Sequence, residues 1–116
     1  MLTLYGLKNC DTCRAARKWL DGAGISYRYH DVRSDGLDDN TISAWLAATN
    51  WETLVNKRSQ TWRKIPEAER SALDESRAAA LLLEYPTLAK RPVLIGDGRM
   101  IVGFSEDRYA ELEHPA

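Results

Sequence analysis

The first third of the chain combines two hydrophobic patterns. Apolar and polar residues alternate over Leu2–Tyr5 and again over Ile25–Val32, which predicts two β-strands. Between residues 11 and 23 the apolar residues instead recur at helical spacing, and Gly22 and Gly24 mark where that spacing ends. The pattern therefore predicts a strand–helix–strand unit, whose crossover helix makes the two strands parallel.

The middle of the chain, residues 34–89, changes to helical patterns without a strong strand pattern. Apolar residues at helical spacing predict a short helix over Asn40–Thr49 and a longer one over Glu69–Glu84. The pair Tyr85-Pro86 ends the longer helix, because the residue before a proline disfavours helical conformation. We therefore expect this segment to be a helical insert.

The last part of the chain returns to strands. Pro92–Gly96 and Arg99–Gly103 are short apolar runs, and the dipeptide Asp97-Gly98 between them is typical of a tight hairpin turn. Ser105 is a residue type preferred at helix N-caps and predicts a short final helix. This segment therefore adds two antiparallel strands and a helix.

The predicted order of elements is βαβ, a helical insert, and ββα. This order predicts an α/β protein with a thioredoxin-like core, in which a four-stranded mixed sheet is interrupted by an all-helical insert between its second and third strands. We expect one domain over residues 1–116, with the core at about 1–33 and 90–113 and the insert at about 34–89.

Composition narrows the classes of partner. The chain has 116 residues, 44% of them hydrophobic, which is enough for one domain with a core. A formal net charge of −1 gives no long-range attraction to nucleic acid or to an anionic membrane, so neither is expected as a direct partner. Met1–Tyr5 already has a strand pattern and not that of a signal peptide, and the longest aliphatic run is Ala78–Leu83. We therefore expect a cytoplasmic protein.

Cys10 and Cys13 are the only cysteines, and they lie where the first strand meets the first helix. The unpaired N–H groups and the dipole of a helix N-terminus stabilise a thiolate, and Lys8 and Arg14 add positive charge that Asp11 opposes. A lowered pKa and an attacking role are therefore predicted for Cys10. Cys13 lies one turn further along, with Cα atoms roughly 5 Å apart, which suits a resolving thiol.

Other interpretations of this motif stay open. The backbone N–H groups of residues 8–13 could hold an oxyanion or a carboxylate of glutathione. Two buried structural cysteines are the simplest alternative. A zinc site would need further ligands, and His30 and His114 do not match the spacing of common zinc sites, so no metal is expected.

Three segments together resemble the ArsC/Spx family, most of all its YffB-like branch of small bacterial proteins. They are Tyr5–Arg17 with the two cysteines, Asn56–Ser59 and Lys90–Ile95. The resemblance covers nearly the whole chain and implies a thioredoxin-like fold with a helical insert. It also implies a thiol-based oxidoreductase, either a glutathione-dependent thiol reductase or an arsenate reductase.

The resemblance implies roles for individual residues. The Cys10 thiolate attacks the substrate, glutathione is the co-substrate, and glutaredoxin is a partner that resolves the mixed disulfide; no tightly bound cofactor is implied. Arg58 and Arg91 hold an anion, which suits the forked donors of a guanidinium, and the bond before Pro92 is cis. The residues expected to bind substrate or anion are Lys8, Asn9, Asp11, Thr12, Arg14, Arg58, Arg91 and Pro92.

Two other functions stay open, and two departures from the family bear on the choice. The alternatives are an Spx-like regulator, which binds the RNA polymerase alpha subunit through a Cys10–Cys13 disulfide switch, and a glutathione-binding protein without catalysis. The third anion-holding arginine of arsenate reductases is replaced by Gly103, which argues against arsenate. The segment Thr49–Glu52 lacks the glycine of Spx, and residues 113–116 lack its basic tail, which argues against the regulator.

Overall fold

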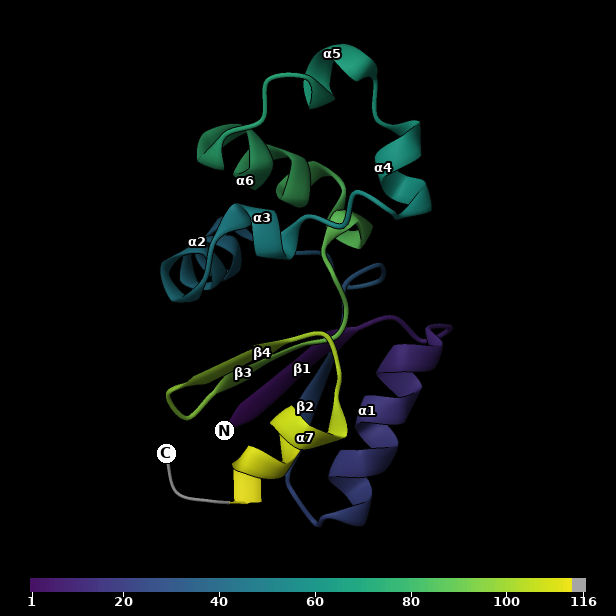
Figure 1. Cartoon of the computed structure of the whole chain (residues 1–116), viewed down its shortest axis with the longest axis vertical. Coiled ribbons are helices and arrows are strands. Elements are labelled where there is room, and N and C mark those ends of the chain that lie inside the picture. The colour runs from purple at the N-terminus through teal and green to yellow at the C-terminus, as the bar shows by residue number, and fades with distance from the viewer. Residues whose placement is uncertain (114–116) are drawn as a thin grey trace. The chain divides into compact units, whose positions relative to one another are not determined.

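The structure is a computed structural model that describes residues 1–113, so the predicted tail with His114 lies outside the described residues. Over the described residues the chain divides into two compact units (Figure 1). The sheet unit consists of Met1–Val32 and the segment that begins at Arg91, and the helical unit is Arg33–Lys90.

The described part of the sheet unit contains a mixed sheet of four strands with the order β2-β1-β3-β4 (Figure 1). β1 is parallel to β2 and antiparallel to β3, and β3 is antiparallel to β4. The predicted βαβ and ββα pattern is therefore confirmed. The elements are β1 (Leu2–Gly6), α1 (Asp11–Gly22), β2 (Tyr27–Asp31), β3 (Val93–Gly96), β4 (Arg99–Val102), α7 (Glu106–Ala110) and a 3₁₀ turn (Glu111–Glu113).

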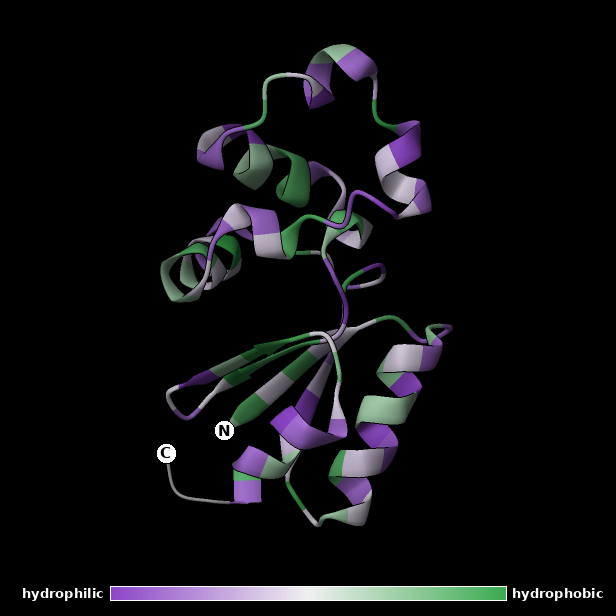
Figure 2. Cartoon of the chain, viewed as in Figure 1, coloured by the Kyte–Doolittle hydropathy of each residue, from purple (hydrophilic) through white to green (hydrophobic). Residues whose placement is uncertain are grey.

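The buried residues of the sheet unit lie at the spacings predicted from the sequence, every second residue along a strand and about one turn apart along a helix. Leu2 and Leu4 alternate along β1 and are buried, and Ala16 and Leu20 lie one turn apart on α1 and are also buried. Figure 2 shows the apolar residues along β1 and β3. Cys13 shares the buried face of α1 and has no exposed surface, so this helix carries its second cysteine into the core.

The β3–β4 hairpin turns at the predicted dipeptide. Asp97 and Gly98 both have positive φ, 52° and 76°, as a type I′ turn requires. The ammonium group of Met1 pairs with the Asp97 carboxylate at 2.7 Å, which ties the start of β1 to this turn. This ion pair lies at the end of β1 remote from the β1–α1 junction.

The helical unit is built from short helices with polar caps. Its elements are α2 (Asp39–Ala48), α3 (Trp51–Leu54), α4 (Gln60–Lys64), α5 (Glu67–Arg70), α6 (Glu75–Glu84) and a 3₁₀ turn (Pro86–Leu88). Ile42, Trp45, Leu81 and Leu82 are buried where α2 packs against α6. Among residues 1–113, the helices lack the length and hydrophobicity to span a bilayer.

The predicted helix over Glu69–Glu84 is wrong in its first part. α5 ends at Arg70 and α6 begins only at Glu75. The reason is local, because Asp74 has an extended backbone and its carboxylate accepts a hydrogen bond from the Arg77 N–H at 2.8 Å. A capping residue therefore divides a segment whose apolar spacing is continuous.

Candidate active site

Cys10 is the N-cap residue of α1, as predicted. Its backbone is extended, its N–H donates to the carbonyl of Leu7 at 3.3 Å, and its carbonyl accepts from the N–H of Arg14 at 3.0 Å. The side chain of Cys10 is half-buried. The sulfur thus lies at a helix N-terminus, where backbone N–H groups lack intrahelical partners.

The surroundings of Cys10 favour its thiolate. Partial burial on its own would raise the pKa of Cys10. Hydrogen bonds from the backbone and the thiol of Cys13 oppose this effect, and so do a hydrogen bond and the positive charge of Arg91. The balance leaves the pKa of Cys10 below its ordinary value, so the sulfur that solvent reaches is also the more acidic one.

Cys13 has the opposite character. It is completely buried, and its sulfur accepts a hydrogen bond from the N–H of Leu7 at 3.5 Å. Burial, with a further contribution from the negative charge of Cys10, raises the pKa of Cys13 to about 12. Both cysteines are free, so the described state is an asymmetric pair with an acidic outer thiol and a buried, protonated inner thiol.

Gly6, at the end of β1, leaves room for the inner thiol. A β-carbon added at this position would lie 2.8 Å from the Cys13 sulfur and 3.4 Å from the hydroxyl oxygen of Tyr29. Sequence reasoning did not identify Gly6 or Tyr29 as part of the site. A glycine at a strand end is the one available sign, because it often marks close approach of other atoms to the backbone.

Arg91 and Pro92 complete the part of the site that lies in the sheet unit. The Arg91–Pro92 bond is cis, as the resemblance implies, and the Pro92 carbonyl accepts from the N–H of Gly103 at 2.8 Å. Arg91 is half-buried and its side chain hydrogen-bonds to the Cys10 sulfur. A fixed, forked cation therefore lies beside the predicted nucleophile, where it can hold an anionic group of a substrate.

The other predicted residues of this loop are exposed. Lys8, Asn9 and Thr12 lie on the surface around Cys10. Asp11 and Arg14 are exposed as well and form an ion pair with each other one turn apart. Their charges largely cancel, so Arg91 is the cation that acts directly on Cys10.

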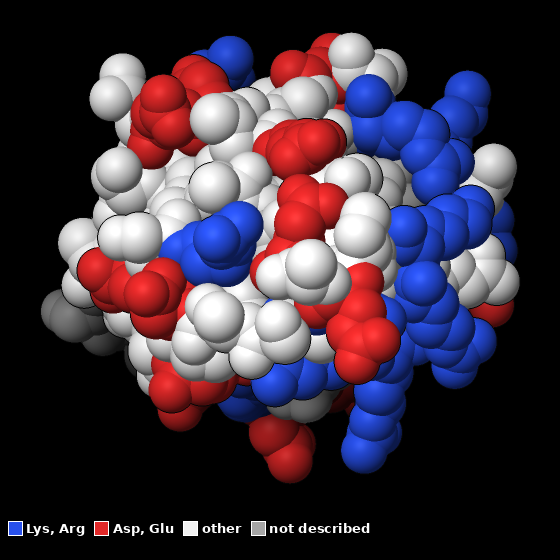
Figure 3. Space-filling model, turned by 90° about the horizontal axis from the view of Figure 1, so that it is seen from above, with Lys and Arg blue, Asp and Glu red and all other residues white. Residues whose placement is uncertain are grey.

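Arg58 lies in the helical unit, and its part in the site stays a prediction. Its backbone N–H donates to the side-chain oxygen of Asn56 at 3.0 Å, and the next residue, Ser59, caps α4. In a view from above, Figure 3 shows many Lys and Arg side chains along one side, and Asp and Glu side chains with a few further basic groups scattered among uncharged residues over the rest. Both signs of charge share this face, which accords with the net charge of −1.

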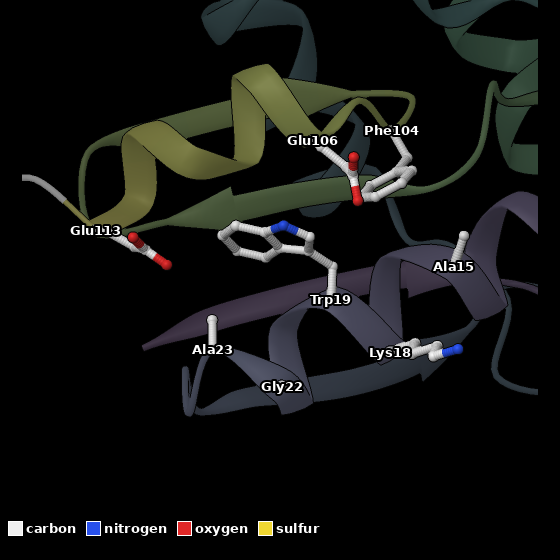
Figure 4. Close-up of a pocket in the computed structure, with 8 residues that line it drawn as sticks. All are labelled: Ala15, Lys18, Trp19, Gly22, Ala23, Phe104, Glu106 and Glu113. Atoms are coloured by element: carbon white, nitrogen blue, oxygen red, sulfur yellow. The ribbon is translucent and has the colours of Figure 1, made fainter.

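The sheet unit has a groove that neither cysteine lines. The groove has a volume of about 520 Å³ and runs between α1 and the segment that includes α7 (Figure 4). Trp19 lies along it, with Phe104 and Glu106 toward one end and Glu113 toward the other. The residues predicted from the sequence as site residues do not line it.

Within the described residues, no group of three or more His, Cys, Asp or Glu side chains is placed to hold a metal ion.

Comparison with known proteins gives one family. A family model described as the ArsC family matches residues 5–112. An uncharacterized protein of Haemophilus influenzae is 46% identical over 109 residues, which cover 94% of this chain and 96% of that protein. The global transcriptional regulator Spx of Listeria monocytogenes is 32% identical over 92% of this chain and 82% of the regulator.

Solved structures agree with the fold. A structure named YFFB has a TM-score of 0.90 at 43% identity, covering 95% of this chain and 96% of that one. An arsenate reductase-related protein from Brucella melitensis has a TM-score of 0.74 at 43% identity, covering 97% and 94%. The arsenate reductase of Vibrio cholerae, 16% identical with a TM-score of 0.75, shares the fold over 96% of this chain and 92% of that one. The predicted thioredoxin-like α/β class is therefore confirmed.

Proposed function

Because the chain belongs to the ArsC family, we propose that it is a thiol-based oxidoreductase in which the Cys10 thiolate attacks the substrate. The observation that carries this proposal is the half-exposed Cys10 at the N-terminus of α1, with its pKa lowered by Cys13 and Arg91. A thiolate that solvent reaches, beside an arginine, is suited to attack on a sulfur or an oxyanion.

The first step forms a covalent intermediate on Cys10. With a disulfide as substrate, the thiolate attacks one sulfur, the sulfur–sulfur bond breaks, and the departing thiolate leaves with the electron pair. Arg91 stabilises negative charge at the reacting sulfur and positions a carboxylate or other anionic group of the substrate. Arg58 is proposed as a second anion-binding residue.

The second step removes the covalently bound substrate group from Cys10. Glutathione is the proposed co-substrate. Its thiolate attacks the Cys10 sulfur from solvent, the bond between Cys10 and the substrate sulfur breaks, and the substrate leaves as a thiolate, so that glutathione remains bound to Cys10 as a mixed disulfide. Cys13 is the internal alternative, because it lies one turn away on the same helix. Glutaredoxin would then reduce a mixed disulfide between glutathione and Cys10.

A disulfide suits the site better than arsenate does. At the position where arsenate reductases carry a third arginine, Gly103 has φ of +81°, a conformation that other residues rarely adopt. A β-carbon there would also lie 3.4 Å from the guanidinium of Arg108. We therefore propose a protein or small-molecule disulfide as the substrate class, with arsenate as the weaker candidate.

A coupled assay tests the function. NADPH oxidation is followed through glutathione reductase and glutaredoxin, with a model disulfide and with arsenate as alternative substrates. We expect turnover of the disulfide that Cys10→Ser reduces to the level without protein and that Cys13→Ser alters without abolishing. Lys18→Gln, an exposed change on α1 outside the proposed site, is the control and should leave turnover unchanged. Full activity of Cys10→Ser would contradict the proposal.

An Spx-like regulator remains the second candidate, because a Listeria Spx protein is 32% identical to this chain. In that function, oxidation of Cys10 and Cys13 to a disulfide would change binding to the RNA polymerase alpha subunit. Pull-down with reduced and oxidised protein tests it. Binding that depends on oxidation would support the regulator, and equal or absent binding in both states would count against it.

A further inference from the structure

The groove between α1 and the segment that includes α7 has an aromatic centre (Figure 4). Trp19 and Phe104 line it, and both are only partly buried although they pack against the core of the sheet unit. An edge-to-face contact with Tyr109, with ring centroids 5.7 Å apart, holds the Trp19 indole in place. A partly exposed, fixed tryptophan inside a hollow is the kind of residue that dominates the affinity of protein interfaces.

The α1 side of the groove offers space and little charge. Ala15, Gly22 and Ala23 line it, and their small side chains leave the Trp19 ring open to a bound chain. Lys18 also belongs to this side, but in Figure 4 its side chain extends along α1 and not across the groove. A ligand can therefore approach the indole without meeting a cation.

The opposite side of the groove is acidic. The segment Ser105–Glu113 contains four carboxylates, and Arg108 is its one basic residue. The guanidinium of Arg108 donates to a carbonyl at the end of β4 and, at 3.4 Å, to the Ser105 hydroxyl, so it is held against the turn before α7. Two of the carboxylates, those of Glu106 and Glu113, line the groove. This wall therefore has a net negative charge that favours a cationic ligand.

The two carboxylates lie toward opposite ends of the groove, with Trp19 between them (Figure 4). Glu106 and Glu113 are seven positions apart on a helical segment, which separates them by roughly 10 Å along its axis. In an extended peptide, alternate side chains share one face, and four residues span roughly 13 Å. A basic residue at the first and fifth positions and an apolar residue at the third therefore match the spacing of the groove.

We propose that this groove binds an extended segment of a partner protein, in which Lys or Arg stands two positions before and two positions after an apolar residue. The apolar side chain packs against Trp19 and Phe104, and the two cations pair with Glu106 and Glu113. Charge complementarity selects this occupant, because a neutral or acidic segment leaves both carboxylates unpaired. The proposal is independent of the thiol chemistry, since neither cysteine lines the groove.

An NMR titration of the reduced, ¹⁵N-labelled full chain tests the proposal. The probe is the blocked peptide Lys-Ser-Leu-Ser-Lys, and the signal followed is the indole N–H of Trp19, identified by its loss in Trp19→Phe or by sequential assignment. We expect this signal to shift and saturate at millimolar peptide. Glu106→Gln should weaken binding about two- to fivefold, the usual worth of one exposed ion pair, and a double variant with Glu113→Gln about tenfold.

Asp107→Asn is the matched control. Asp107 is exposed, stands beside Glu106 in the first turn of α7 and carries the same charge, but it does not line the groove. Its replacement should leave the affinity nearly unchanged.

Two control peptides separate the contributions of charge and apolar contact. One carries glutamate in place of both lysines, and the other carries serine in place of leucine. Both should bind about tenfold more weakly than the probe. High salt should also weaken binding of the probe, because it screens exposed ion pairs.

Four results would overturn the proposal. The first two are absence of a saturable Trp19 shift at millimolar peptide and equal binding of the glutamate peptide, which would mark a groove for any apolar ligand. The third is an equal loss of affinity in Asp107→Asn and Glu106→Gln. The fourth is a Trp19 signal that moves with protein concentration in the absence of peptide, which would assign the groove to a second copy of this chain.

Discussion

At the scale of single residues, the site depends on a difference between two similar side chains. Cys10 and Cys13 lie one helical turn apart, yet the pKa of the first is lowered and that of the second is raised to about 12. The helix terminus and Arg91 act on the half-exposed sulfur, while burial dominates at the inner one. The proposed order of attack, Cys10 before Cys13, therefore follows from where α1 begins and not from the residue type.

The first prediction concerns Arg91. Because it lowers the pKa of Cys10, Arg91→Gln should move the pH midpoint of Cys10 alkylation by iodoacetamide upward. A midpoint that rises by about one pH unit would lower the alkylation rate near pH 7 about tenfold. Cys13→Ser serves as the background in both proteins, so that a single thiol reacts, and Lys18→Gln should leave the midpoint unchanged. An unaltered midpoint in Arg91→Gln would show that Arg91 does not act on this sulfur.

The second prediction compares two glycines. Gly6→Ala would place a β-carbon 2.8 Å from the Cys13 sulfur, so the core must shift, and we expect a loss of about 1–3 kcal/mol in the free energy of unfolding. At Gly22, in the last turn of α1, an added β-carbon meets nothing within 4 Å. Gly22→Ala should stabilise the protein by about 0.5–1 kcal/mol. Urea unfolding measures both, and equal effects would contradict the explanation.

At the scale of elements, polar caps decide boundaries that hydrophobic spacing does not reveal. The strand periods and the Asp97-Gly98 turn were predictable because each is a local property of a few residues. The predicted helix over Glu69–Glu84 was not correct, because Asp74 interrupts it while the apolar spacing continues. An aspartate within a helical pattern is therefore better treated as a possible start of a new helix.

The third prediction tests that cap. Asp74→Ala removes the acceptor of the 2.8 Å hydrogen bond from the Arg77 N–H, so the free energy of unfolding should fall by about 1 kcal/mol. Asp74→Asn keeps an acceptor oxygen and should cost less. Thermal or urea unfolding compares the two. A loss that is the same for alanine and asparagine would show that the charge, and not the cap, stabilises α6.

At the scale of the whole molecule, the sequence predicted the order of strands and helices along the chain and the place of Cys10 at a helix start, but not the surroundings of Cys13. Position at a strand–helix junction is encoded within about ten residues. The approach of Gly6 and Tyr29 to Cys13 instead requires the pairing of β1 with β2 and the packing of α1 on them. Contacts of that kind depend on register and burial, which a single sequence does not state.

The last prediction concerns how the free energy of unfolding depends on pH because Cys13 is buried. An unfolded chain ionises a thiol near its ordinary pKa, whereas the folded chain keeps Cys13 protonated up to about pH 12. The stability that this group contributes is therefore complete below the ordinary thiol pKa and is lost as the pH rises toward 12. Between pH 8 and pH 10, the reduced wild type should lose about 2 kcal/mol more in free energy of unfolding than Cys13→Ser does. Urea titrations at each pH, under a reductant, measure the difference. Parallel pH dependences for the two proteins would mean that ionisation of Cys13 is not linked to unfolding.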